Sequence, residues 1–259
     1  MIDDRWLETW VERLRGLYPN TVAILLAGSH ARGEAGPHSD VDLRVVQSHG
    51  VTGYPVFFEP TADGRLRHIS VDLTTLDEWE GEGDEPADWA LFLPTEQVER
   101  LVWATPDVAA RLGPTPTKRQ PAGDPQVEDF LEYASKVKNA LRAGDSLALR
   151  WAAHGQARLA PGLLAALNPP VRAQTAVHAL KLALDFPVAP PGYRQAMLVC
   201  LGLDDQGHTD AEVAQASRAL ALGVFRLLRE RDGIGIAEAD LRQALLDGTL
   251  EQYLKQTAA

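Results

Sequence analysis

LAGSHARGEAGPHSDVDLRVV, residues 26–46, is the stretch that decides the fold of this chain. Its second half alternates charged and apolar side chains, as a strand with one buried face does, and Asp40 and Asp42 are on the charged side. Because side chains two positions apart leave a strand on the same face, both carboxylates point the same way. Neighbouring carboxylates repel each other unless a cation lies between them, and Mg²⁺ prefers oxygen ligands. The pattern therefore predicts a magnesium site.

The first half of the stretch predicts a phosphate-binding turn. Residues 21–27, TVAILLA, are typical of a buried strand that ends at Gly28, where the missing side chain lets a ligand approach the backbone. Ser29 is a good N-cap for a short helix through Arg32, and a helix N-terminus binds anions. We expect Gly28 and Ser29 to hold nucleotide phosphates. Arg32 can either reach a phosphate or pair with the aspartates.

GSHARGEAGPHSDVDLRVV resembles the signature of the DNA polymerase β-like nucleotidyltransferases, a Gly-Ser turn followed by an Asp-x-Asp strand. The sequence of residues 28–35, GSHARGEA, resembles that of the minimal nucleotidyltransferases and the antibiotic adenylyltransferases. The resemblance implies an α+β fold, in which a mixed-sheet nucleotidyltransferase domain is followed by an all-α helical bundle. It also implies a third carboxylate on a neighbouring strand.

Asp72 matches that third carboxylate in order and in strand setting. It belongs to a predicted strand, residues 65–73, in which His68, Ser70 and Asp72 alternate with apolar side chains. If this strand pairs with the Asp-x-Asp strand, Asp40, Asp42 and Asp72 can converge on one Mg²⁺. Asp72 is then either a metal ligand or the base that takes the hydroxyl proton. Glu59 is a weaker alternative, and His68 fits a surface residue better than a catalytic one.

A proline-rich segment, residues 113–125 (GPTPTKRQPAGDP), predicts a linker. Residues 1–112 then form the nucleotidyltransferase domain, and residues 126–259 form the helical bundle, whose helical periodicity predicts helices over 126–143, 146–167, 171–186, 210–232 and 237–246. Tyr133 and Lys136 lie three apart on the first of these helices. Since the resemblance places a second domain against the nucleotide, we expect Tyr133 to stack on its base and Lys136 to neutralise its triphosphate.

Charge and composition indicate which kinds of binding partner this chain suits. The formal net charge of −11 argues against general nucleic-acid binding and suits attraction of a small polycation. Cys200 is the single cysteine, the first residues lack the basic start and apolar run of a secretory signal, and no apolar stretch reaches membrane-spanning length. These features predict a cytoplasmic protein with no membrane contact.

The expected reaction is magnesium-dependent transfer of a nucleoside monophosphate, AMP from ATP, to a hydroxyl of a small acceptor. The acidity and the two-domain layout favour a cationic acceptor such as an aminoglycoside-like antibiotic. The acidic run of residues 77–88 fits a solvated loop better than a rim that would attract such an acceptor. Two alternatives stay open. One is modification of a protein hydroxyl, as toxin-neutralising minimal nucleotidyltransferases carry out. The other is a nucleotide-binding module without turnover.

Overall fold

The computed structural model describes residues 2–61, 63–87 and 91–256. It divides into two compact units, each of which is described by itself. The first holds residues 1–85 and 96–120, and the second holds residues 86–95 and 121–259. The predicted linker, residues 113–125, is divided between the two units, and part of it forms a strand, β7 (Thr117–Gln120).

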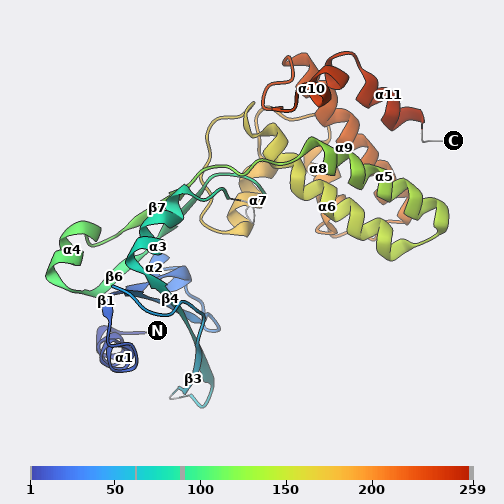
Figure 1. The fold of residues 1–259 in the computed structure, drawn as a ribbon. Helices are drawn as coiled ribbons and strands as arrows, with labels where there is room; N and C mark the ends of the chain where they lie inside the picture. Colours follow the sequence, from blue (N-terminus) through green and yellow to red (C-terminus); the bar gives the residue numbers. More distant parts are fainter. Residues whose placement is uncertain (1, 62, 88–90, 257–259) are drawn as a thin grey trace. The chain divides into compact units, whose positions relative to one another are not determined.

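A five-stranded sheet in the order β3-β4-β2-β1-β6 is the centre of the first unit (Figure 1). Within it, β2 and β4 run parallel, whereas the other neighbours are antiparallel. The predicted mixed sheet is thus confirmed, and so is the pairing of the Asp-x-Asp strand with the strand that carries Asp72. The strands are β1 (Thr21–Leu26), β2 (Val41–Gln47), β3 (Val56–Pro60), β4 (Leu66–Thr75) and β6 (Arg100–Ala104).

One face of this sheet is closed by a helix. The helix α1 (Asp4–Leu17) is capped by Asp3, whose side chain accepts from the Trp6 backbone N–H, and it buries Leu7, Trp10 and Leu14. These side chains join the apolar residues of β2 and β4 in one core. Strand alternation therefore sends the polar residues of both strands, including the aspartates, to the opposite face.

Short elements complete the first unit. The helices are α2 (Gly28–Arg32), α3 (Leu76–Gly81) and α4 (Pro106–Leu112), with a 3₁₀ turn at Glu82–Asp84. A second, two-stranded sheet joins β5 (Thr95–Val98) to β7.

The second unit is helical, which confirms the predicted bundle. Its core includes Phe130 and Phe225, whose rings meet edge to face 5.5 Å apart. The predicted third helix is shorter than expected, and sequence periodicity missed the short helices α8 and α11. No helix in the described part of the chain is long and apolar enough to cross a membrane. The helices are α5 (Val127–Ala143), α6 (Ser146–Ala165), α7 (Ala176–Leu184), α8 (Tyr193–Leu201), α9 (Asp210–Glu230), α10 (Ala239–Leu246) and α11 (Thr249–Gln256).

Candidate active site

Asp42 lies against the bare backbone of Gly28. The Ala27 N–H donates to the Asp42 carbonyl over 2.9 Å, which ties the end of β1 to the start of β2. Gly28 has φ +62°, and a Cβ placed there would lie 2.0 Å from Asp42 Oδ2. Because neither the backbone angle nor the space admits a side chain, glycine is required for this carboxylate to keep its position.

The predicted cap of α2 differs from the structure. Ala27, not Ser29, occupies the N-cap position, and the helix starts at Gly28. Ser29 therefore lies inside the first turn of a helix that has no side-chain cap. Its hydroxyl remains a candidate phosphate contact, as the sequence predicts, but it does not cap the helix.

Asp40 and Asp42 form a pair with more negative charge than their neighbours neutralise. Burial and, next to it, repulsion from Asp40 raise the pKa of the Asp42 carboxyl, while His68 and Arg32 lower it. His68 Nδ1 lies 3.7 Å from Asp40 Oδ2, and it is a cation only when protonated. Such a donor set fits Mg²⁺, which binds through one or two carboxylates and takes its remaining ligands from substrate phosphates and water.

Asp72 is not brought to this pair. The parallel register sets Ser70 opposite Asp42 and sets Asp72 opposite Arg44, one side-chain position farther along the same face. Arg44 Nε lies 2.8 Å from Asp72 Oδ2. Within residues 2–61, 63–87 and 91–256, no three Asp, Glu, His or Cys side chains gather as a metal site would require. The expected convergence of three carboxylates is therefore absent from this geometry.

Arg44 is the centre of a second acidic cluster. Its Nη1 atom donates to Glu82 Oε2 over 2.6 Å and lies 3.2 Å from Glu99 Oε1. Glu99 is 2% exposed, and burial raises the pKa of its carboxyl although Arg44 opposes the shift. The Trp79 indole N–H donates to the other Glu99 oxygen over 3.0 Å. The pull of one buried guanidinium on three carboxylates explains why Asp72 lies here.

Other predicted residues of the first unit have local partners. Arg32 Nε donates to Glu34 over 2.8 Å, so an ion pair outside the aspartates occupies it. Glu59, the weaker candidate for the third carboxylate, accepts from the Trp6 indole N–H over 2.7 Å. Neither residue reaches the Asp40–Asp42 pair with a hydrogen bond between side chains.

In the second unit, Tyr133 and Lys136 are engaged within the bundle. A Cβ at Gly155 of α6 would lie 2.6 Å from the Tyr133 ring, so that ring fills the space that the glycine leaves between α5 and α6. Lys136 Nζ pairs with Glu132 over 3.0 Å and lies 5.1 Å from the centre of the Tyr133 ring. Both residues thus have helix-packing and surface partners, and their predicted nucleotide contacts stay predictions.

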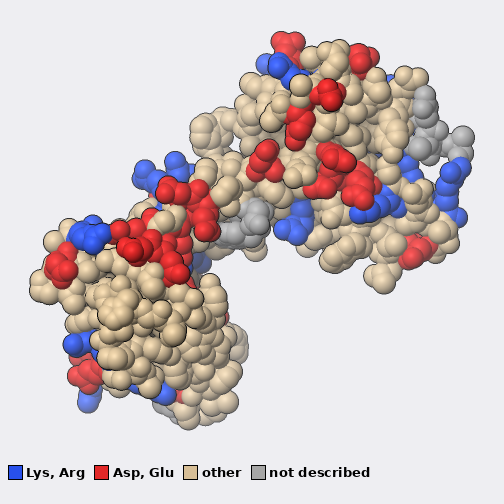
Figure 2. Space-filling model, viewed as in Figure 1, with Lys and Arg blue, Asp and Glu red and all other residues tan. Residues whose placement is uncertain are grey.

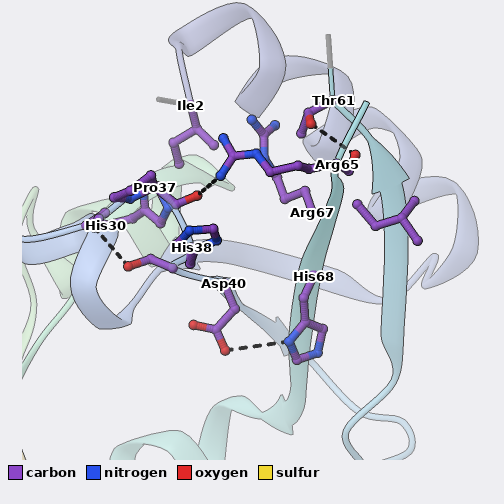
Figure 3. Close-up of a pocket in the computed structure, with 13 residues that line it drawn as sticks. Ile2, His30, Pro37, His38, Asp40, Thr61, Arg65, Arg67 and His68 are labelled. Atoms are coloured by element: carbon purple, nitrogen blue, oxygen red, sulfur yellow. Dashed lines mark hydrogen bonds and ion pairs between the residues drawn. The ribbon is translucent and has the colours of Figure 1, made fainter. Parts of the chain in front are cut away.

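His68 is the residue that sequence reasoning undervalued. It lies on β4 beside Asp40, and its ring stacks on Phe58 with centroids 5.4 Å apart. Figure 3 shows His68 directed toward Asp40 at the edge of a cavity of about 380 Å³. The alternation of residues 68–72 did place His68 on the polar face, but the register that sets it beside Asp40 is a tertiary property.

Comparison with known families identifies both parts of the chain. Residues 7–85 match the model of the nucleotidyltransferase domain, and residues 126–230 match the model described as nucleotidyltransferase, substrate binding domain. A comparison with curated protein sequences gives no significant match. A nucleotidyltransferase-like protein from Exiguobacterium sibiricum, of known crystal structure, is similar at 13% identity and a TM-score of 0.41, over 98% of this chain and 91% of that one. That last similarity is too low to support an argument about the site.

Proposed function

This chain belongs to the DNA polymerase β-like nucleotidyltransferases, and we propose that it transfers a nucleoside monophosphate, AMP from ATP, to a hydroxyl of a small molecule. The single observation that carries the proposal is the Asp40–Asp42 pair. Among the described residues its nearest basic partner is His68, 3.7 Å from Asp40, and Asp42 lies in the space that Gly28 leaves.

Asp40 and Asp42 would hold the divalent cation, which we propose to be Mg²⁺. Bound there, the cation would neutralise the triphosphate and stabilise the attacking and leaving oxygens. The chain's own part is to keep both carboxylates on one strand face, to open the backbone at Gly28, and to offer the Ser29 hydroxyl to the β and γ phosphates. Pyrophosphate is the leaving group.

Asp72 has a supporting role in this proposal. It holds Arg44, which follows Asp42 by one alternation of the same strand, and so it keeps the end of β2 in place. The nucleotide contacts expected of Tyr133 and Lys136 stay predictions, and no step of the proposed chemistry depends on them.

The test is pyrophosphate release by the full chain with ATP, Mg²⁺ and a panel of hydroxyl-bearing small molecules. The panel includes aminoglycosides and sugar phosphates, so that cationic and anionic acceptors are compared under the same conditions. Release that requires both an acceptor and Asp42 is the expected result. Tight binding of magnesium–ATP without release for any acceptor would contradict the proposal and favour a nucleotide-binding module.

A further inference from the structure

A cavity on the first unit is lined by Asp40 and by several basic side chains. Its volume is about 380 Å³, within the range of small-molecule sites. The loop of residues 35–40, the start of α2 and the start of β4 surround it (Figure 3). Asp40 is the single acidic member of its described lining, whereas the basic members are His30, His38, Arg65, Arg67 and His68. Arg65 and Arg67 are permanently charged, whereas a histidine is a cation only when protonated, so in a chain of net charge −11 this lining holds two arginines against one carboxylate.

Arg65 is held in place at the mouth of this cavity. Its Nη1 atom donates to the Pro37 carbonyl over 2.7 Å, which joins β4 to the loop that precedes the Asp-x-Asp strand. Its Nη2 atom lies 2.6 Å from Asp63, an ion pair in which both side chains are about half exposed. Its Nε atom donates to the same Asp63 oxygen over 2.8 Å, so an incoming anion would have to share this guanidinium with Asp63.

Arg67 is less exposed than Arg65 and is less neutralised. Its guanidinium lies 5.1 Å from the centre of the Trp6 ring, and its side chain is 21% exposed. The nearest carboxylate, Glu59, is 3.8 Å away, beyond hydrogen-bond distance, and already accepts from Trp6. Arg67 also helps to lower the pKa of His30, after burial, so its field extends to the α2 side of the cavity. A fixed, partly buried guanidinium of this kind is suited to a phosphate oxygen.

We propose that this cavity binds an anionic group, a phosphate or phosphomonoester, that belongs to the acceptor molecule. The inference rests on the proposed nucleotidyl transfer and names the acceptor class. Gly28 and Ser29 do not line the cavity, so it is separate from the turn assigned to the nucleotide phosphates. Because attacking and leaving oxygens lie in line on opposite sides of the phosphorus, a second anion position at Asp40 suits the attacking partner. The acceptor is then anionic at this end, in place of the polycation that net charge suggests.

The experiment uses inorganic phosphate and phenyl phosphate as probes, measured by calorimetry on the full chain. Arg67→Gln and Arg65→Gln should each weaken binding of both probes about 10-fold, the loss expected for one charged hydrogen bond. Arg119→Gln removes an exposed arginine of the same unit outside the cavity and should leave binding unchanged. Ser29→Ala should also leave phosphate binding unchanged while it weakens magnesium–ATP.

A competition separates the acceptor from the nucleotide as the source of the phosphate. Phenyl phosphate should bind with equal affinity in the presence of saturating magnesium and a non-hydrolysable ATP analogue. Competitive displacement by the analogue would overturn the inference, since the cavity would then hold the triphosphate. Absence of probe binding, or its loss in Ser29→Ala with retention in Arg67→Gln, would overturn it as well.

Three further measurements serve as controls for this test. Thermal unfolding of Arg67→Gln guards against a loss of fold through the Trp6 contact, and Arg67→Lys, which keeps the charge, should retain part of the binding. Asp42→Asn should lower the pyrophosphate release of the proposed function about 10³-fold but leave phosphate binding by the cavity intact. Failure of the anion site and failure of nucleotidyl transfer can therefore be told apart.

Discussion

Two groups of carboxylates lie near the same face of the sheet, and they differ in their basic partners. Asp72, Glu82 and Glu99 surround Arg44, so that the second group carries its own cation. Asp40 and Asp42 have a histidine at 3.7 Å as their nearest basic partner. Acidic side chains are also conspicuous over the part of the first unit that carries α3 (Figure 2). The number of acidic side chains alone therefore does not identify the candidate metal site.

The difference lies in what each group lacks. A buried ion cluster loses much of its stability when its cation is removed, because the remaining carboxylates are then buried without a partner. Two neighbouring carboxylates without a cation repel each other, and the rest of the fold has to offset that repulsion. A bound cation removes the repulsion, so the pair favours cation binding. The following substitutions separate these two kinds of acid, from the largest expected effect to the smallest.

Asp42→Asn should lower the rate of transfer by about 10³-fold with the fold intact, the upper range for loss of one preorganised electrostatic group. Its stability carries a second signature. Because the folded-state pKa of Asp42 is raised, its ionised form costs stability at any pH above that pKa. Asp42→Asn should therefore unfold at higher urea than the parent at pH 7, and the difference should shrink as pH falls. A near-normal rate would contradict the metal role.

Arg44→Met should destabilise the chain by about 3–5 kcal/mol at pH 7, because it leaves three carboxylates without their cation. Glu99 already has a raised pKa, so acidification protonates the cluster and should recover part of the loss. Urea unfolding at pH 7 and pH 5 measures both effects. Unchanged stability at pH 7 would show that Arg44 does not hold these three carboxylates in place.

Gly28→Ala should lower the rate of transfer about 100-fold, because its Cβ collides with the Asp42 carboxylate and a displaced preorganised group costs a rate of this order. Gly33→Ala is the matched control. Gly33 has φ +72° but no atom within 4 Å of an added Cβ, so the control carries the backbone strain without the collision. Equal rates in the two variants would mean that strain, not the position of Asp42, determines the loss.

Asp72→Asn should have the smallest effect on chemistry, a loss of rate of about 10-fold, the lower end of what loss of an outer partner of a metal site costs. Stability should fall modestly, since Arg44 keeps Glu82 and Glu99. Steady-state rates measured beside those of Asp42→Asn make the comparison direct. A loss as large as that of Asp42→Asn would return Asp72 to the metal.

Much of the fold could be predicted from local patterns. The alternation around Asp40 and Asp42 predicts β2, the apolar run of residues 21–27 predicts β1, and helical periodicity predicts a bundle. The misses are short helices such as Tyr193–Leu201, which are too brief for periodicity to separate from loops. The partners of the acidic run, residues 77–88, could not be predicted either. Glu82 binds Arg44, and this contact depends on where β2 lies in the folded chain.

The amino-acid sequence by itself determined that a Gly-Ser turn precedes an Asp-x-Asp strand, and that polar residues of two strands share a face, because side-chain direction follows chain position. Tertiary structure alone decided which polar residues are neighbours. A parallel pair can be set in several registers that keep the same face, and each shift of two residues changes every cross-strand partner. In the register observed here, Asp72 lies beside Arg44 and His68 lies beside Asp40.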